Sequence, residues 1–346
     1  MNFSKILTYW YSANKRSLPW RNTKNPYHIW LSEIIMQQTQ VKQGSPYYEA
    51  FVTHFPTVFD LANANEETVL KLWQGLGYYS RARNLHASAR YIAQELAGQF
   101  PSTYSELLKL KGVGDYTASA IASICFNEPT AVVDGNVYRV LSRYFGVDIP
   151  INSTQGIKAF KTLATSLIDT KNPGDYNQAI MEFGAIQCKP KNPYCSDCPL
   201  KDSCVALQKG KVNALPVKLK KTKVTKKHFN FLVVISEDKK TIFEKRSSKG
   251  IWQNLYQFPL IETEDILVSE GFKTEPKIQS YFKDLDFEYC LYNTKELVHK
   301  LSHQHLYTKF WIIEVNQLPK EGIPISDLKT YPTPILISNF IDAFDF

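Results

Sequence analysis

Residues 110–118, LKGVGDYTA, decide the fold of the first half of the chain. Gly112 and Gly114 stand two positions apart, and glycine accepts the positive φ values and close backbone approach that a tight turn between helices needs. Small and apolar side chains follow at helical spacing over 118–124. The stretch matches a helix–hairpin–helix. A Gly-x-Gly sequence by itself also fits an ordinary turn between helices.

Composition limits the classes of protein that the chain can represent. It has 346 residues with 44% hydrophobic and 21% charged side chains, which suits two globular domains and excludes a mostly disordered chain. No run of 18 apolar residues is present, and residues 1–16 lack the pattern of a secretory signal, so we expect a bacterial cytoplasmic protein without a membrane partner. The net charge of +8 and 13% aromatic residues fit a polyanionic partner.

Four of the six cysteines lie within seventeen residues, with six, two and five residues between successive members. Such clustering indicates a metal site in a reducing compartment rather than disulfides. Either a tetrahedral zinc or a [4Fe–4S] cluster takes four thiolates. Only one Cys-x2-Cys pair is present, whereas zinc sites usually have two, which favours the cluster. The expected ligands are Cys188, Cys195, Cys198 and Cys204.

The pattern of residue types changes after the cysteines. Helical patterns occur at 28–43, 118–124 and 179–186, whereas 229–235, 241–246 and 309–315 have the β-branched and aromatic content of strands. Between these parts, 209–227 holds eight lysines and no acidic residue and reads as a basic linker. The sequence therefore predicts an α+β protein with an all-α domain at 1–208, a linker at 209–227 and a smaller α+β domain at 228–346.

The cysteine spacing and the hairpin together resemble the endonuclease III superfamily of DNA glycosylases. Residues 133–137, VDGNV, follow the hairpin where that superfamily has its catalytic aspartate. Three further stretches resemble MutY-type adenine DNA glycosylases, namely 18–21 (LPWR), 32–41 (SEIIMQQTQV) and 75–85 (GLGYYSRARNL).

This resemblance implies the catalytic residues. Glu33 is the expected general acid, since burial raises a carboxyl pKa and keeps the group protonated. Asp134 is expected to remain ionised and to stabilise an oxocarbenium ion, with Tyr116 and Asn136 supporting the intermediate. The superfamily's bifunctional members have a lysine at position 116, which forms a Schiff base; tyrosine cannot, so excision should stop at the abasic site. Each residue alone has a plainer interpretation: Asp134 as a helix N-cap and Glu33 as a surface carboxylate.

The resemblance also implies the residues that contact DNA. The adenine, flipped out of the duplex, is expected to bind Trp20, Arg21 and Glu182, although Glu182 also fits an ordinary helix-surface carboxylate. The hairpin N–H groups are expected to hold a backbone phosphate. The remaining expected contacts with the strands are Gln38, Thr39, Leu76, Tyr78, Gly112, Val113 and Gly114.

The second domain resembles the Nudix-like domain that this family uses to inspect 8-oxoguanine. Residues 250–259, GIWQNLYQFP, carry the likeness, and 262–275 lacks the glutamate-rich helix of a Nudix hydrolase. Ser302 and His303 occupy the place of the family's Phe-Ser-His loop, with Leu301 in place of the phenylalanine. We therefore expect a monomeric, monofunctional glycosylase for adenine opposite 8-oxoguanine or guanine. The alternatives are a thymine or uracil mismatch glycosylase and a catalytically silent DNA-damage binding protein.

Overall fold

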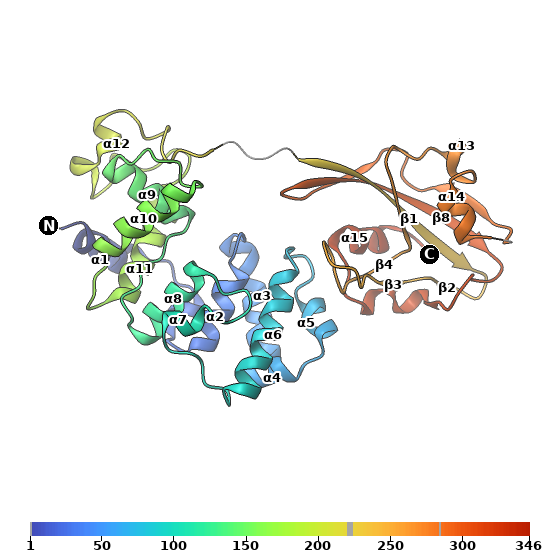
Figure 1. Ribbon diagram of the computed structural model, residues 1–346, viewed down its shortest axis with the longest axis horizontal. Coiled ribbons are helices and arrows are strands. Elements are labelled where there is room, and N and C mark those ends of the chain that lie inside the picture. The colour runs from blue at the N-terminus through green and yellow to red at the C-terminus, as the bar shows by residue number, and fades with distance from the viewer. Residues whose placement is uncertain (1, 220–223, 284) are drawn as a thin grey trace. The chain divides into compact units, whose positions relative to one another are not determined.

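The computed structural model describes residues 2–219, 224–283 and 285–346. The chain forms two compact units, coloured by residue number in Figure 1. The first comprises 1–63 and 84–220, and the second comprises 64–83 and 221–346. The second unit therefore includes a short segment that the sequence analysis placed in the helical domain. Within the described residues, no helix has both the length and the apolar character needed to cross a bilayer.

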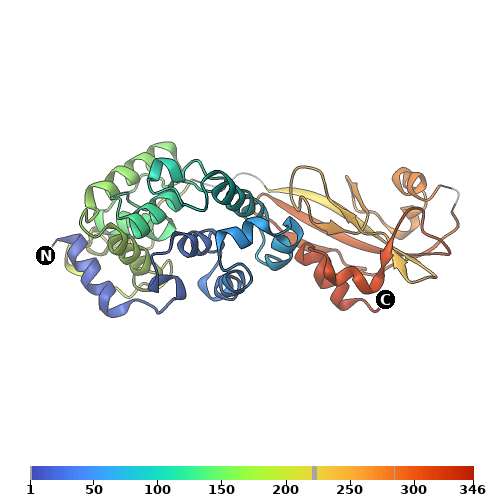
Figure 2. The ribbon, with the colours of Figure 1, turned by 90° about the horizontal axis from the view of Figure 1, so that it is seen from below.

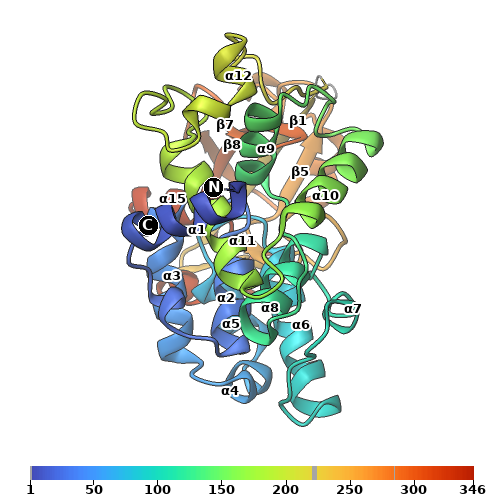
Figure 3. The same ribbon diagram turned by 90° about the vertical axis from the view of Figure 1, so that its left-hand side faces the viewer.

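The first unit is built from helices, with α8 packed against both α2 and α11 near its centre (Figure 3). Its core includes the fully buried rings of Trp30, Phe51, Phe160 and Phe183. Its elements are α1 (Phe3–Asn14), η1 (Pro19–Asn22), α2 (Pro26–Ile35), α3 (Val41–His54), α4 (Val58–Asn63), α6 (Ser80–Glu95, whose first turn groups with the second unit), α7 (Tyr104–Leu107), α8 (Asp115–Phe126), α9 (Gly135–Phe145), α10 (Thr154–Leu167), α11 (Pro173–Glu182), η2 (Phe183–Gln187), η3 (Lys201–Ser203) and α12 (Val205–Gln208).

The helical pattern predicted over 28–43 proves to be two helices. The Asn25 side chain caps the start of α2, and Pro26 takes the first helical position, where its missing N–H costs nothing. The helix ends at Ile35, and Gln38 has a φ of +55°, which breaks the helical path before α3 begins at Val41. Residues 36–40 therefore form a turn, and apolar spacing alone did not reveal it.

The predicted hairpin joins α7 to α8. Gly112 has a φ of +80°, and a Cβ built there would lie 2.8 Å from the Cβ of Asn84, so no other residue fits without a shift. Gly114 is the N-cap of α8, and Asp115 is its first residue. The N-terminus of α8 thus begins directly at the hairpin, as the helix–hairpin–helix pattern predicts.

The second unit contains a mixed sheet in the order β6-β8-β1-β2-β9, with β5 also paired to β1 and β7 to β8. The central pair, β1 (Thr225–Ser236) and β8 (Gln304–Val315), is parallel over twelve residues. The other strands are β2 (Lys240–Thr241), β5 (Leu260–Thr263), β6 (Glu288–Leu291), β7 (Leu297–Lys300) and β9 (Ile323–Pro324), and a separate hairpin joins β3 (Glu244–Lys245) to β4 (Tyr256–Gln257). The α+β class predicted from the sequence is confirmed.

Helices cover both faces of this sheet, which explains why the central strands are continuous apolar runs. On one face, Trp311 stacks on Phe272. On the other, Phe310 stacks on Phe340 with ring centroids 4.1 Å apart. The C-terminal helix, coloured red, lies along this side of the sheet in Figure 2. The helices of the second unit are α5 (Glu66–Leu72), α13 (Ser269–Phe272), α14 (Pro276–Tyr281), η4 (Ile325–Thr330) and α15 (Ile335–Ala343).

Two predicted segments differ in detail from the structure. The strand expected over 241–246 is interrupted between β2 and β3. Part of the expected linker lies on the first unit, where Val217 accepts a backbone hydrogen bond from Ile151 and Leu215 accepts one from Arg143. Its last residues, 225–227, belong to β1, and 220–223 lie outside the described residues.

Candidate active site

Glu33 lies in the middle of α2, among buried neighbours that include Ser32 and Ile34. Burial raises the pKa of Glu33 from its ordinary 4.5 to about 7; a hydrogen bond from Tyr116 opposes this shift, and the nearby Asp134 adds to it. A carboxyl group with such a pKa is partly protonated at neutral pH. It can therefore give a proton to a bound base.

Asp134 comes from a different part of the chain and is the N-cap of α9. Its Oδ1 accepts hydrogen bonds from the backbone N–H groups of Asn136 (2.9 Å) and Val137 (2.8 Å), and its Oδ2 accepts one from the Asn136 side-chain amide (2.7 Å). Burial raises the pKa of Asp134, while these three bonds act in the opposite direction. The plain N-cap role and the proposed catalytic role are therefore compatible, because the capping donors also stabilise the carboxylate anion.

Tyr116 connects the two carboxyl groups. It is the second residue of α8, immediately after the hairpin, and burial first and then the charges of Glu33 and Asp134 raise its pKa well above 10. The phenol is therefore a neutral hydrogen-bond donor, and its hydroxyl also contacts Met181 Sδ at 3.1 Å. The structure thus brings together Glu33, Tyr116 and Asp134 from three separate elements.

Glu182 is buried at the end of α11, with only 1% of its side chain exposed. Its two oxygens accept hydrogen bonds from the guanidinium groups of Arg16 and Arg21 at 2.6 to 2.9 Å, together with the backbone N–H of Arg16. Burial disfavours the charge, but the bonds from Arg21 and Arg16 lower the pKa of Glu182 to about 2. The interpretation as an ordinary surface carboxylate is wrong.

Arg16 was not among the residues predicted for the site. The sequence signal for Arg16 was its position two residues before the 18–21 stretch. In the structure it binds the same carboxylate as Arg21. Trp20 is buried beside Tyr48, with an edge-on ring contact at 5.1 Å. Arg21 is also close enough to Glu33 to lower its pKa. Arg21, which is bonded to Glu182, therefore lies near the proposed general acid within the first unit.

A second arginine that the sequence analysis missed extends the site toward the cysteines. Arg139, which is buried in α9, donates from Nη2 to Asn136 Oδ1 (2.8 Å) and Gly184 O (2.6 Å), and from Nε to Cys188 O (2.7 Å). Arg143, one helical turn later, donates to Cys188 Sγ (3.4 Å) and Lys189 O (2.8 Å). Two arginines four residues apart on a mostly buried helix were the available signal, because buried guanidinium groups need acceptors.

The four predicted cysteine ligands line one cavity together with Arg143 and Tyr194. Within the described residues, no three His, Cys, Asp or Glu side chains are grouped as a single metal ion requires. Four thiols around a common cavity, with an arginine beside one of them, fit the four thiolate ligands of a [4Fe–4S] cluster. The cysteines are Cys188, Cys195, Cys198 and Cys204.

The residues predicted to contact the DNA strands lie at turns. Gln38 is exposed and Thr39 half-buried in the turn after α2, which is tied to α8 by a bond from the Gln37 amide to Thr117 Oγ1 (3.2 Å). At the hairpin, Gly112 and Gly114 are exposed and Val113 is buried.

In the second unit, Tyr78 is 47% exposed, whereas Leu76 is buried. Ser302 and His303 are exposed in the hairpin turn between β7 and β8, and Leu301 is half-buried there. Ser302 Oγ lies 3.4 Å from His303 Nδ1. Both ends of this turn are paired strands, so its position on the sheet is well defined.

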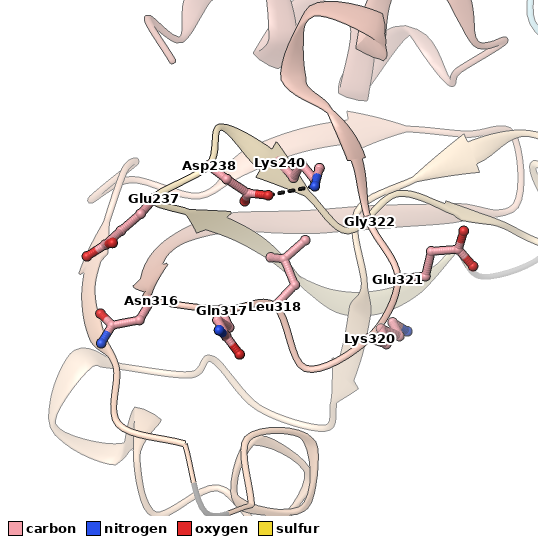
Figure 4. Close-up of a pocket in the computed structure, with 9 residues that line it drawn as sticks. All are labelled: Glu237, Asp238, Lys240, Asn316, Gln317, Leu318, Lys320, Glu321 and Gly322. Carbon is pink, nitrogen blue, oxygen red and sulfur yellow. Dashed lines mark ion pairs between the residues drawn. The ribbon is translucent and has the colours of Figure 1, made fainter.

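None of these residues lines a wide hollow of the second unit. It is lined by the turn after β1 and by the connection from β8 to β9, as Figure 4 shows. Lys240 pairs with Asp238 at 2.6 Å there, and none of the predicted site residues contributes to the wall. The hollow is lined by side chains of both charges, and neither Glu33 nor Asp134 is among them.

Comparisons with known proteins agree with this geometry. Residues 31–161 match the HhH-GPD superfamily of base excision DNA repair proteins, and residues 230–343 match the NUDIX domain. The adenine DNA glycosylase of Buchnera aphidicola subsp. Baizongia pistaciae (strain Bp) is 35% identical over 312 residues, which is 90% of this chain and 86% of that protein. The adenine DNA glycosylase of Homo sapiens is 45% identical over 216 residues, covering 60% of this chain and 40% of the human protein.

Solved structures match part of the chain. A thermostable thymine-DNA glycosylase aligns with a TM-score of 0.55 at 29% identity, covering 60% of this chain and 95% of that chain. Endonuclease III from a non-covalent DNA complex aligns with a TM-score of 0.52 at 22% identity and shows that the fold is shared. The carboxyl pair, the two matched domains and the similarity to the Buchnera protein along most of its length lead to one conclusion: the chain belongs to the adenine DNA glycosylases, enzymes of base excision repair that hydrolyse an N-glycosyl bond.

Proposed function

We propose that this protein removes adenine opposite 8-oxoguanine or guanine in duplex DNA and leaves an intact abasic strand. The observation that carries the proposal is the juxtaposition of Glu33, Tyr116 and Asp134. One carboxyl group has a pKa near neutrality, and the other accepts three hydrogen bonds. This is the division between acid and anion that cleavage of a glycosidic bond requires.

The protonated Glu33 gives its proton to N7 of the flipped adenine. The C1′–N9 bond then breaks, and its electron pair leaves with the base. Asp134 stabilises the positive charge that develops at C1′. Water adds to C1′ and loses a proton to the Glu33 carboxylate, which restores the starting state. Tyr116 supplies a neutral hydroxyl and no amine, so this sequence includes no Schiff base.

Binding of the DNA is assigned to several surfaces. The exposed backbone at Gly112 and Gly114 and the N-terminus of α8 would take a phosphate. Trp20, Arg21 and Glu182 would hold the adenine in the first unit. Tyr78 of the second unit would enter the base stack. The Ser302 hydroxyl can accept from N7–H of 8-oxoguanine, a donor that guanine lacks.

Cys188, Cys195, Cys198 and Cys204 would hold a [4Fe–4S] cluster. When bound, the cluster would supply a rigid cross-link for this loop and no chemistry at the glycosidic bond. Arg139 and Arg143 would then join the loop to α9 through the hydrogen bonds described above.

The test uses purified protein and four duplexes that differ only in the base opposite adenine: 8-oxoguanine, guanine, cytosine or thymine. A fifth duplex carries thymine opposite guanine. We expect free adenine from the first two, and strand breaks only after alkali. Release of thymine, or release of no base from any duplex, would overturn the proposal. Strand cleavage without alkali would overturn its monofunctional part.

A further inference from the structure

Residues 64–83 group with the second unit, although the chain on both sides of them belongs to the first. The segment carries α5 and the loop 75–78, which is proposed above to enter the duplex. Two acidic residues of α5 anchor its first turn. Glu67 pairs with Lys245 (2.9 Å) and accepts from the Tyr256 hydroxyl (2.8 Å), and Glu66 accepts from the Asn254 amide. The segment is therefore attached to the second unit through specific polar contacts.

A second set of contacts lies next to the loop. Lys71 Nζ donates to the backbone oxygens of Lys329 (2.6 Å) and Tyr331 (3.1 Å). Gln74 uses both ends of its amide: Oε1 accepts from Thr333 N (3.1 Å), and Nε2 donates to Ser338 Oγ (2.9 Å). Side chains from α5 and the turn that follows it thus bind the end of η4, the extended residues after it and the first part of α15.

The most direct contact between the loop and the C-terminal part of the chain is made by the hydroxyl group of Tyr79. Tyr79 Oη accepts from the backbone N–H of Gly75 (3.4 Å) and donates to Thr333 O (3.1 Å). Tyr79 is buried, and so is Thr333. The first peptide of the loop is therefore connected to the C-terminal part of the chain through a single phenol.

The loop has a backbone that needs such support. Gly75, Gly77 and Tyr78 all have positive φ values, +99°, +72° and +48°, and a non-glycine residue in this region is strained. Inside the loop, Gly77 O accepts from Trp73 Nε1 (3.0 Å) and Arg81 Nη2 (3.2 Å). This conformation buries Leu76 and leaves the Tyr78 ring exposed.

We propose that the segment 329–338 is the support that holds the 75–78 loop ready to enter the duplex, with Tyr79 and Gln74 as its positioning residues. This inference rests on the proposed function, because it concerns how that loop acts on DNA. It also means that the two elements assigned to lesion inspection, Tyr78 and the Ser302 turn, belong to the same compact unit. Separation of stacked bases by the loop and recognition of 8-oxoguanine by the Ser302 turn would then be coupled.

The test compares Tyr79→Phe with Tyr289→Phe, whose hydroxyl also donates to a backbone oxygen of the same unit, that of Ser269 at 3.0 Å. Gln74→Leu is the second variant, and melting curves check the folding of all three. Single-turnover excision is measured on adenine opposite 8-oxoguanine and on adenine opposite an abasic-site analogue, where no opposing base has to be unstacked. A 2-aminopurine beside the lesion reports unstacking without any chemistry.

We expect Tyr79→Phe and Gln74→Leu to slow excision opposite 8-oxoguanine by about five- to tenfold, because each variant removes two hydrogen bonds of modest strength. The rise in 2-aminopurine fluorescence should fall in parallel, and the abasic duplex and Tyr289→Phe should show wild-type values. Equal slowing on both duplexes, or wild-type fluorescence in both variants, would overturn the support role. If wild-type protein excises no adenine from any duplex, the proposed function fails, while the fluorescence signal still tests the loop.

Discussion

The side-chain amide of Asn136 bridges Asp134 and Arg139: its Nδ2 donates to Asp134 Oδ2 at 2.7 Å, and its Oδ1 accepts from Arg139 Nη2 at 2.8 Å. Arg139 in turn donates to the backbone oxygen of Cys188. A continuous chain of hydrogen bonds therefore joins the proposed catalytic anion to the cysteine loop. Because each amide atom is engaged, the orientation of Asn136 is set, and with it the donor that faces Asp134.

This chain predicts the effect of replacing Arg139 by lysine. Arg139→Lys keeps the positive charge but loses the fork that reaches Asn136, Gly184 and Cys188 together. We expect the single-turnover excision rate to fall by about tenfold, the worth of one charge-assisted hydrogen bond, with duplex affinity unchanged. Arg143→Lys is the control, because Arg143 contacts the cysteine loop and not Asn136. Equal losses in the two variants would assign the effect to the loop rather than to Asn136.

The pKa of Glu33 predicts the pH dependence of excision. A general acid must be protonated, so the rate should be highest below pH 7 and should fall tenfold per pH unit above the pKa of about 7. Glu33→Gln should abolish excision at every pH while the protein still binds duplex. The measurement is the single-turnover rate between pH 5.5 and 9 on one duplex. A rate that stays constant up to pH 9 would show that Glu33 is not the acid.

Position 116 decides whether an amine can trap the sugar. Tyr116→Lys places a primary amine beside Glu33 and Asp134, and borohydride should then capture a covalent protein–DNA complex that wild-type protein does not form. Tyr116→Phe, which removes only the hydroxyl, should not be trapped. Both variants are compared on gels after borohydride treatment. Trapping of wild-type protein to the same extent as Tyr116→Lys would contradict the monofunctional assignment.

The buried Glu182 predicts a stability effect. Glu182→Gln leaves two guanidinium groups facing a neutral amide, and we expect unfolding to become easier by about 3 kcal/mol. The folded pKa of Glu182 is lowered to about 2, so its contribution is present above its ordinary pKa of 4.5 and is lost as the pH falls toward 2. Denaturant melts at pH 7 and pH 3 measure both effects. Asp238→Asn, which breaks the exposed pair with Lys240, is the control and should leave the midpoint unchanged.

Local sequence was sufficient to predict a structural element wherever that element depends on residues close together in the chain. The hairpin at 110–118 depends on two glycines and the helix that follows, and the structure shows that turn with Gly112 at positive φ. The strands at 229–235 and 309–315 could also be predicted, because a parallel pair covered on both faces is mostly apolar, as in 231–235 and 310–313. The catalytic assignments of Glu33, Tyr116 and Asp134 came from resemblance, and the predicted roles still await experiment.

Only the tertiary structure showed what those residues touch. The break in the helical pattern at Gln38 appeared only as a positive φ of the folded backbone. The second cation beside Glu182 and the bonds from Arg139 to Gly184 and Cys188 join groups that are far apart in the sequence. The grouping of residues 64–83 with the C-terminal part of the chain has the same origin. Periodicity reports which face of a helix is apolar, whereas a buried charge is satisfied by partners that the folded chain alone brings within hydrogen-bonding distance.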